Sequence, residues 1–281
     1  MFQYAFYVVM RKHYPNHTFL IDKKVMLPQQ HNGYELDRVF GIELEECRLS
    51  DYIGYIRHIY MRSKMATPLN LLFYVGRSIW PNKNFYKQKD YSAYYPEVLS
   101  RFQDSNAFLK GIWANENYFE GNREELLKQF TFRQELDEKN RELLEQIDRT
   151  DSVSIHIRRG DYCKGNNHLL SGDYYKRAAD LIQQKLDAPV WFVFSDDMEA
   201  AKELMAGVVG GSVVFVGGNT GDNSWKDLYL MSRCKHNIIA NSSFSFWGAW
   251  LNRSDNKIVI SSATPMSDTM QPFTCKDWIQ I

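Results

Sequence analysis

The second half of the chain alternates between short apolar runs and longer amphipathic segments, and this alternation constrains the fold more than any other feature. Five runs rich in β-branched and aromatic residues read as strands: residues 152–157, 190–194, 212–216, 237–240 and 257–261. Four segments between them read as helices: residues 171–186, 197–206, 225–234 and 244–251. Repeated strand-helix units predict an α/β fold with a parallel, doubly wound sheet.

The first half of the chain is less regular. Residues 1–12 predict a helix, residues 18–21 a short strand, and residues 124–148 one or two charged helices. Residues 73–95 are rich in aromatic side chains without clear periodicity, which favours an irregular connection over an acceptor-facing or membrane-facing surface. We therefore place a domain boundary near Asp151, which separates residues 1–150 from residues 151–281.

Charge and composition exclude several classes of protein. The 281 residues carry 34 basic and 34 acidic side chains, so the chain lacks the positive excess that drives binding to nucleic acid. Its four cysteines are widely separated, and their spacing to the histidines does not resemble a metal site, so we expect reduced thiols, no metal and a cytoplasmic location. No apolar stretch approaches the roughly 18 residues of a membrane span.

The loop after the first predicted strand of the second half carries an unusual set of charged residues. His156, Arg158, Arg159 and Asp161 lie within six residues, around the flexible backbone of Gly160. Two guanidinium groups at the end of a buried strand favour an anion, because the arginine fork matches phosphate oxygens. The alternative is an exposed arginine pair bridged to Asp161.

Two further loops after predicted strands carry polar residues. The first holds Ser195, Asp196 and Asp197, which taken alone favour the cap of the following helix with acids in its first turn. The second precedes the last helix, where backbone N–H groups form a natural phosphate cradle, and it holds Asn241, Ser242, Ser243, Phe244 and Ser245. Because all three loops follow parallel strands, they meet at one edge of the sheet, as a nucleotide-sugar site requires.

At the level of motifs, the chain resembles the α-1,2-fucosyltransferase family. The matching segments are residues 1–5, 111–119, 156–162 (His-Ile-Arg-Arg-Gly-Asp-Tyr), 194–197, 227–232 and 241–251. The resemblance implies a GT-B-like fold of two Rossmann-like domains with the donor site in the cleft between them. It also implies inverting transfer of L-fucose from GDP-fucose to the 2-hydroxyl of a galactoside-type acceptor, in the synthesis of surface glycans such as O antigen.

The resemblance also implies roles for individual residues. Arg158 would stabilise the departing β-phosphate, with Arg159 in support and Asp161 orienting both. Ser242, Ser243 and Ser245 would hold phosphate, and Asp196 or Asp197 would meet the ribose or base. His156 would either contact the diphosphate or ribose or, as a histidine inside a strand, be a hydrogen-bonded group of the core. No metal or other cofactor is expected. The general base stays open among Glu116, Asp37 and Asp161.

Other interpretations stay open at this point. The alternatives are a fucosyltransferase of another linkage or with a protein acceptor, and a catalytically silent nucleotide-sugar-binding protein. Family members usually carry a strand and a Gly-rich turn ahead of the residues that match Met1–Ala5, so we expect the first domain to be incomplete at its start. Peripheral contact with the inner face of a membrane, through a lipid-linked acceptor, is a further expectation.

Overall fold

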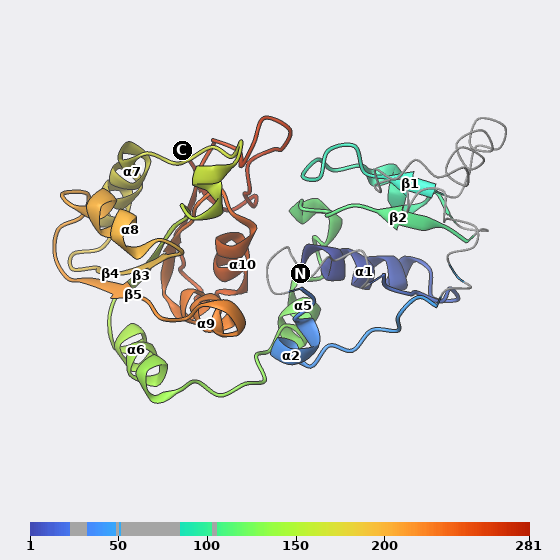
Figure 1. Cartoon of the computed structure of the whole chain (residues 1–281), viewed down its shortest axis with the longest axis horizontal. Coiled ribbons are helices and arrows are strands. Elements are labelled where there is room, and N and C mark those ends of the chain that lie inside the picture. Colours follow the sequence, from blue (N-terminus) through green and yellow to red (C-terminus); the bar gives the residue numbers. More distant parts are fainter. Residues whose placement is uncertain (23–32, 49–50, 52–84, 103–105) are drawn as a thin grey trace.

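The computed structural model describes residues 1–22, 33–48, 51, 85–102 and 106–281, and every structural statement below refers to these residues. They form an α/β structure in which the second half contains one large sheet and the first half packs beside it (Figure 1). The segment predicted to be an irregular aromatic connection lies mostly outside the described residues, apart from its last part, residues 85–95.

The sheet of the second half is parallel throughout, with the strand order β5-β4-β3-β6-β7-β8. All five predicted strands are present, and β8 is an additional short one. Their bounds are Ser152–Ile157 (β3), Val190–Ser195 (β4), Val213–Val216 (β5), His236–Ile238 (β6), Val259–Ser261 (β7) and Ile279–Gln280 (β8). Every residue of β3 is buried, as expected for a strand covered on both faces. The predicted fold class, an α/β fold with a parallel sheet, is confirmed.

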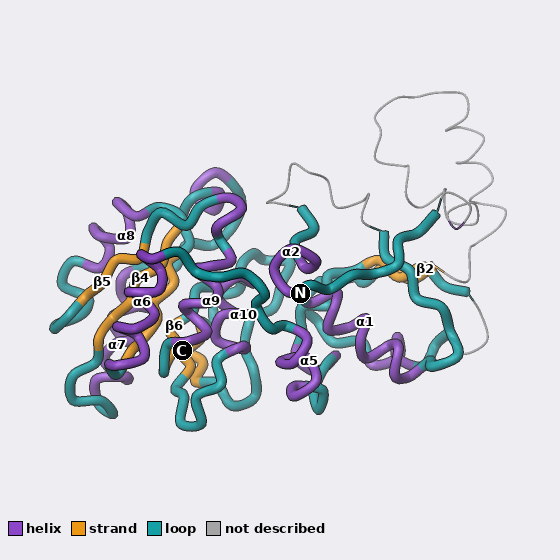
Figure 2. The backbone as a smooth tube through the Cα atoms, turned by 90° about the horizontal axis from the view of Figure 1, so that it is seen from below, coloured by secondary structure: helices purple, strands orange, loops and turns teal. Residues whose placement is uncertain are grey.

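The four predicted helices of the second half are also present, and they cover both faces of the sheet (Figures 1 and 2). Both faces need covering because the side chains of strand β4 alternate between two hydrophobic clusters, one on each face of the sheet. Trp191 and Val193 pack with α7 and α8, whereas Phe192 and Phe194 belong to the cluster that contains α9 and α10. The helices are Gly172–Gln183 (α7), Met198–Met205 (α8), Trp225–Arg233 (α9) and Ser243–Leu251 (α10).

The first half combines short helices with a small two-stranded sheet, in which β1 and β2 pair in parallel. The predicted helix at the start is confirmed, but the predicted strand at residues 18–21 is wrong. Only an isolated bridge joins Ile21 to Glu46, because the segment lacks a longer partner among the described residues. The elements are Phe2–His13 (α1), Leu36–Phe40 (α2), Phe85–Lys87 (β1), Pro96–Leu99 (η2), Phe108–Lys110 (β2), Glu116–Tyr118 (η3) and Arg123–Gln129 (α5).

Helix α6 (Glu138–Arg149) follows the first half in sequence but packs against α9 of the second half. Asn140 donates to Asn219 over 3.1 Å, and Asn219 in turn donates to Asp227, whose pKa is raised to about 7 by burial. An ion pair between Lys226 and Asp137 lies beside this network. We therefore propose that the domain boundary lies in the connector at residues 130–137, ahead of α6 and not near Asp151.

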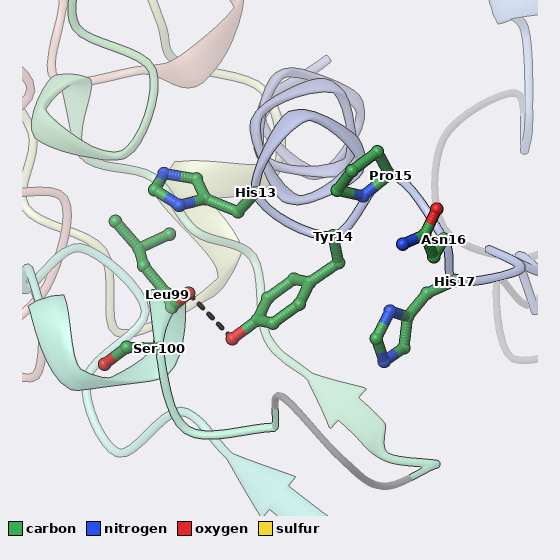
Figure 3. Close-up of a pocket in the computed structure, with 7 residues that line it drawn as sticks. All are labelled: His13, Tyr14, Pro15, Asn16, His17, Leu99 and Ser100. Atoms are coloured by element: carbon green, nitrogen blue, oxygen red, sulfur yellow. Dashed lines mark hydrogen bonds between the residues drawn. The ribbon is translucent and has the colours of Figure 1, made fainter.

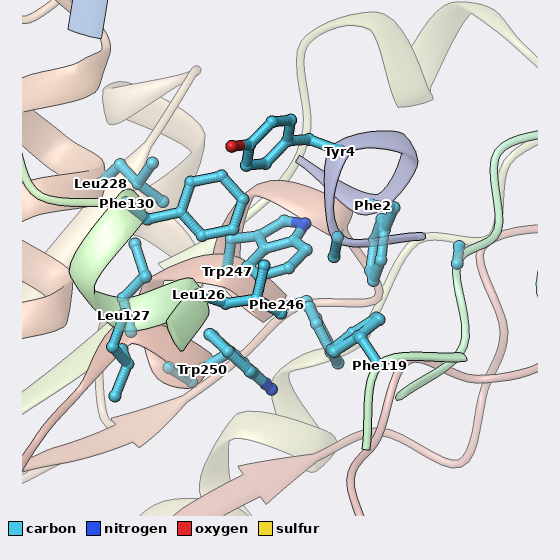
Figure 4. Close-up of a cluster of buried hydrophobic side chains, with 14 of the residues drawn as sticks. Phe2, Tyr4, Phe119, Leu126, Leu127, Phe130, Leu228, Phe246, Trp247 and Trp250 are labelled. Carbon is cyan, nitrogen blue, oxygen red and sulfur yellow. The ribbon is translucent and has the colours of Figure 1, made fainter. Parts of the chain in front are cut away.

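Aromatic side chains from both halves form the core between them (Figure 4). The ring of Phe2 lies 4.8 Å from that of Phe246 and 4.9 Å from that of Trp247. Trp247 also stacks on Phe119 and contacts Phe130 edge-on, so a single residue of α10 touches three separate segments of the first half. This cluster holds the first half against the start of α10. In the described part of the chain, no helix combines the length and the apolar character needed to cross a bilayer.

Replacing Trp247 by alanine should cost about 3–5 kcal/mol in the free energy of unfolding, because it leaves a large cavity in this shared core. Urea denaturation followed by circular dichroism measures the loss. As a control, Phe215→Ala, at an exposed position of β5, should cost less than about 1 kcal/mol. A loss below about 1 kcal/mol for Trp247→Ala would show that the two halves do not depend on this cluster.

Candidate donor-binding site

The order of the strands brings two of the predicted loops together. Strands β4 and β5, which follow β3 in sequence, lie on one side of β3 in the sheet. Strand β6, which comes next, pairs with β3 on its other side. The carboxyl ends of β3 and β6 therefore diverge at a topological switch point, where open α/β sheets bind their ligands. The arginine loop follows β3 and the serine loop follows β6, so both lie at this point. The acidic loop follows the neighbouring strand β4.

Arg158 is held in place by two carboxylates. Its Nη2 lies 2.6 Å from Asp161 and its Nη1 lies 3.0 Å from Asp196, while the guanidinium carbon lies 5.4 Å from the ring centre of Tyr162. The side chain of Arg158 is 19% exposed, and its buried Nε has no hydrogen-bond partner among the described residues. The predicted orienting role of Asp161 is compatible with this geometry, in which two carboxylates fix the Arg158 guanidinium.

The acidic loop is engaged within the protein. Besides Arg158, Asp196 binds the backbone N–H of Arg159 over 2.8 Å. A Cβ atom on Gly160 would lie 2.4 Å from Oδ2 of Asp196, so only glycine allows this approach. Asp197 caps α8 by accepting the N–H of Ala200, and the Ser195 hydroxyl accepts the N–H of Asp197. Contact of Asp196 or Asp197 with a ribose or base stays a prediction.

His156 lies inside the sheet, beneath the arginine loop. It is 3% exposed, and its ring centre lies 5.7 Å from that of Phe244 in the serine loop. Burial, together with the neighbouring charge of Arg158, lowers the pKa of His156 to about 3, so the imidazole is neutral at physiological pH. Its Nδ1 has no hydrogen-bond partner among the described residues. A neutral, buried imidazole can donate or accept one hydrogen bond but cannot supply positive charge.

The serine loop begins α10 and uses most of its hydroxyls internally. Ser242 caps the helix by accepting the N–H of Phe244, and the buried Ser245 donates to the carbonyls of Ala240 and Ser242. Asn241 donates to the carbonyls of two residues outside the loop. Ser243 alone among the three serines is exposed. Ser243 is thus the serine of this loop that faces solvent, and phosphate binding by the three serines stays a prediction.

Sequence reasoning did not single out Tyr162, although it joins the two loops of the switch point. Its buried hydroxyl donates to the carbonyl of Asn241 over 3.2 Å, and its ring lies under the Arg158 guanidinium. Burial raises the pKa of Tyr162 to about 12, so the hydroxyl stays protonated as a donor. The position of this tyrosine directly after Arg-Arg-Gly-Asp is the only signal in the sequence that could have pointed to it.

Two cavities lie near the first half. The larger one, of about 500 Å³, lies between the two halves and is lined by Ala114, Asn115, Glu116, Asn117, Glu120, Phe246, Gln271, Pro272, Thr274, Cys275, Lys276 and Gln280. The smaller one, of about 270 Å³, lies between the end of α1 and η2, where the Tyr14 hydroxyl donates to the carbonyl of Leu99 (Figure 3). Within the described ranges, no three His, Cys, Asp or Glu side chains gather as a metal would require.

Comparison with known proteins places this chain in a family. The profile of "Glycosyl transferase family 11" matches residues 2–281. The chain belongs to this family of glycosyltransferases. Among its relatives, an alpha-1,2-colitosyltransferase of Escherichia coli is 38% identical over 62% of this chain and 61% of its own length. The O-antigen biosynthesis glycosyltransferase WbnK of Escherichia coli is 28% identical over 100% of this chain and 96% of its own length.

A human relative and a solved structure extend the comparison. Galactoside alpha-(1,2)-fucosyltransferase 1 of Homo sapiens is 30% identical over 63% of this chain and 52% of its own length. The chain thus matches only about half to two thirds of the length of this protein and of the colitosyltransferase. The solved structure of E. coli ADP-heptose lps heptosyltransferase II aligns with 100% of this chain and 86% of its own, at 14% identity and a TM-score of 0.45.

Replacing Gly160 by alanine should lower the free energy of unfolding by about 1–3 kcal/mol, because the new methyl group displaces Asp196 from Arg158 and from the backbone of the arginine loop. Urea denaturation measures this loss. Gly172→Ala is the matched control, since a Cβ at Gly172 meets nothing within 4 Å, and it should cause no loss. Equal stability of the two variants would contradict the tight contact with Asp196.

Proposed function

We propose that this protein transfers a deoxyhexose, L-fucose in the first instance, from its GDP-linked form to the 2-hydroxyl of a galactoside-type acceptor, with inversion at the anomeric carbon, in the synthesis of surface glycans such as O antigen. The observation that carries the proposal is the position of Arg158 at the switch point of the sheet, over the ring of Tyr162, whose hydroxyl donates to the carbonyl of Asn241 ahead of α10. Membership of glycosyl transferase family 11 supports the reaction type, and the printed activities of the relatives support the sugar.

The proposed chemistry uses charge that is already in place. As the bond to the sugar breaks, negative charge grows on the β-phosphate, and Arg158 can stabilise it without moving far. The guanidinium would exchange one of its carboxylate partners for phosphate oxygens. Asp161, whose side chain is 55% exposed, is the partner that can leave for water, whereas Asp196 is 24% exposed and also holds the loop backbone. The first turn of α10 would bind the other phosphate oxygens.

Within the proposal, the relatives leave two donor sugars to distinguish, fucose and colitose. Competition between GDP-fucose and GDP-colitose for a β-galactoside acceptor, with NMR of the purified product, identifies both the sugar and the linkage. A product linked through another hydroxyl would overturn the proposed 2-linkage. Binding of GDP without any transfer would instead favour a silent nucleotide-sugar-binding protein.

Replacing Arg158 by lysine should lower kcat at least about a hundredfold, because lysine keeps the charge but cannot make the bidentate contact. The KM for the acceptor should change little, since the contact strengthens as the diphosphate leaves. Steady-state kinetics with GDP-fucose and a β-galactoside measures both constants. Arg177→Lys on the exposed face of α7 is the control and should retain activity within about threefold. Near-normal turnover of Arg158→Lys would remove Arg158 from its central role.

Removal of divalent metal ions by a chelator should leave the rate of sugar transfer nearly unchanged. The proposed stabilisation of the diphosphate comes from a guanidinium and the first turn of a helix. The rate of transfer is measured before and after dialysis against EDTA, and again after addition of Mn²⁺ or Mg²⁺. Loss of activity with EDTA that is restored by either ion would show that the arginine-centred account is wrong.

A further inference from the structure

The larger cavity has the polar lining that carbohydrates require. It is an open pocket of about 500 Å³, a size typical of sites for small ligands, and its walls come from both halves of the molecule. Its lining combines the amides of Asn117, Gln271 and Gln280 with the carboxylates of Glu116 and Glu120. Amide and carboxylate groups pair with sugar hydroxyls both as donors and as acceptors.

Two connections place this cavity beside the donor-binding loops. Phe246, which lines the cavity, lies two residues after Phe244, whose ring contacts His156. The segment between β7 and β8 also joins them. The Asn241 side chain donates to the carbonyl of Pro265 near the start of this segment, and residues 271, 272 and 274–276 of its later part line the cavity. A ligand in the cavity would therefore lie next to the proposed diphosphate site.

The chain enters the cavity wall through a strained turn. Trp113 has φ +61°, in the left-handed region that residues other than glycine rarely adopt. The fully buried Gln88 holds this backbone, since its Oε1 accepts the N–H groups of Ile112 and Trp113. Strain that the surroundings maintain in this way is common at ligand-binding sites. Its effect here is to direct Ala114–Asn117 into the cavity wall.

Glu116 is the carboxylate of the cavity whose orientation is fixed. Its Oε2 accepts the backbone N–H of Lys276 over 3.2 Å, and burial together with the negative charge of this carboxylate raises the pKa of the neighbouring Cys275 thiol. The thiol therefore stays neutral. Glu120 is exposed, and its carboxylate makes no hydrogen bond or ion pair that we find within the described ranges. A base must hold one geometry to take a proton efficiently, which favours Glu116.

The other two carboxylates considered from the sequence do not meet this requirement. Asp161 is paired with Arg158, so its negative charge serves the guanidinium. Asp37 lies in the first turn of α2 and lines neither described cavity. Glu116 is the one of the three that lies in a cavity large enough for a sugar.

We propose that this cavity binds the carbohydrate acceptor and that Glu116 is the general base for its reacting hydroxyl; this inference rests on the proposed function. The carboxylate of Glu116 takes the proton of the acceptor O–H as the oxygen forms its bond to the anomeric carbon of the donor sugar. The bond from that carbon to the β-phosphate oxygen breaks, and its electron pair leaves with GDP. No oxidant, metal or further reactant enters the balance.

The first test is Glu116→Gln, which keeps the shape of the side chain and its contact with Lys276 but removes the basic carboxylate. We expect kcat for transfer from GDP-fucose to a β-galactoside to fall about a hundredfold or more, with the Kd for GDP within threefold of the unchanged chain. Asp37→Asn is the matched control and should keep kcat within threefold. Retention of kcat in Glu116→Gln would overturn the base assignment, and so would loss of GDP binding, which would assign Glu116 to the fold.

The second test fills the cavity and does not depend on turnover. Asn117 is exposed and lines the cavity, so Asn117→Trp should fold while it occupies acceptor space. We expect the Kd for lactose, measured by NMR titration in the presence of GDP, to rise at least tenfold. An unchanged Kd would overturn the acceptor site. If the unchanged chain transfers no deoxyhexose yet binds lactose in a way that Asn117→Trp weakens, the proposed function fails while the carbohydrate site stands.

Discussion

The pairing of β3 with β4 on one side and with β6 on the other is the constraint on which the site depends. Each pairing fixes where a loop leaves the sheet, so the arginine loop and the serine loop emerge side by side although about eighty residues separate them in sequence. Tyr162 then joins the two loops by one hydrogen bond and places its ring under Arg158. A shift in the register of β6 would separate the guanidinium from the start of α10.

The positive charge of Arg158 is balanced by two carboxylates, one of which is exposed to solvent. Arg158 is mostly buried and therefore needs negative charge, which Asp161 and Asp196 supply. The neighbouring His156 is neutral, so it adds no second positive charge. In the proposed function, an incoming diphosphate would replace the exposed Asp161 while Asp196 keeps the loop in place. Under the proposed function, this local arrangement would let an anionic donor bind to a protein with no net charge.

The two halves of the molecule are joined by α10 in two ways. Its apolar face carries Phe246 and Trp247, which pack on Phe2 and Phe119 of the first half. Its first turn forms part of the proposed diphosphate site, and Phe246 also lines the larger cavity. Packing between the halves therefore sets the distance from the donor site to the cavity. A change in this core would affect the site as well as stability.

The sequence by itself determined the elements of the second half and the residues of the three loops. Apolar runs of strand length and helical periodicity are local properties, so β3 to β7 and α7 to α10 could be predicted from them. The two-residue strand β8 and the single bridge at Ile21 are too short to leave a recognisable pattern in the sequence. Only the tertiary structure decided how the polar residues are used. In the fold, Ser245 and Asp197 make hydrogen bonds at helix starts, and α6 packs on the second half. Glu116 and Lys276 meet at one cavity. The physical reason is that hydrogen bonds and packing between residues far apart in sequence depend on the complete fold, and no local pattern encodes them.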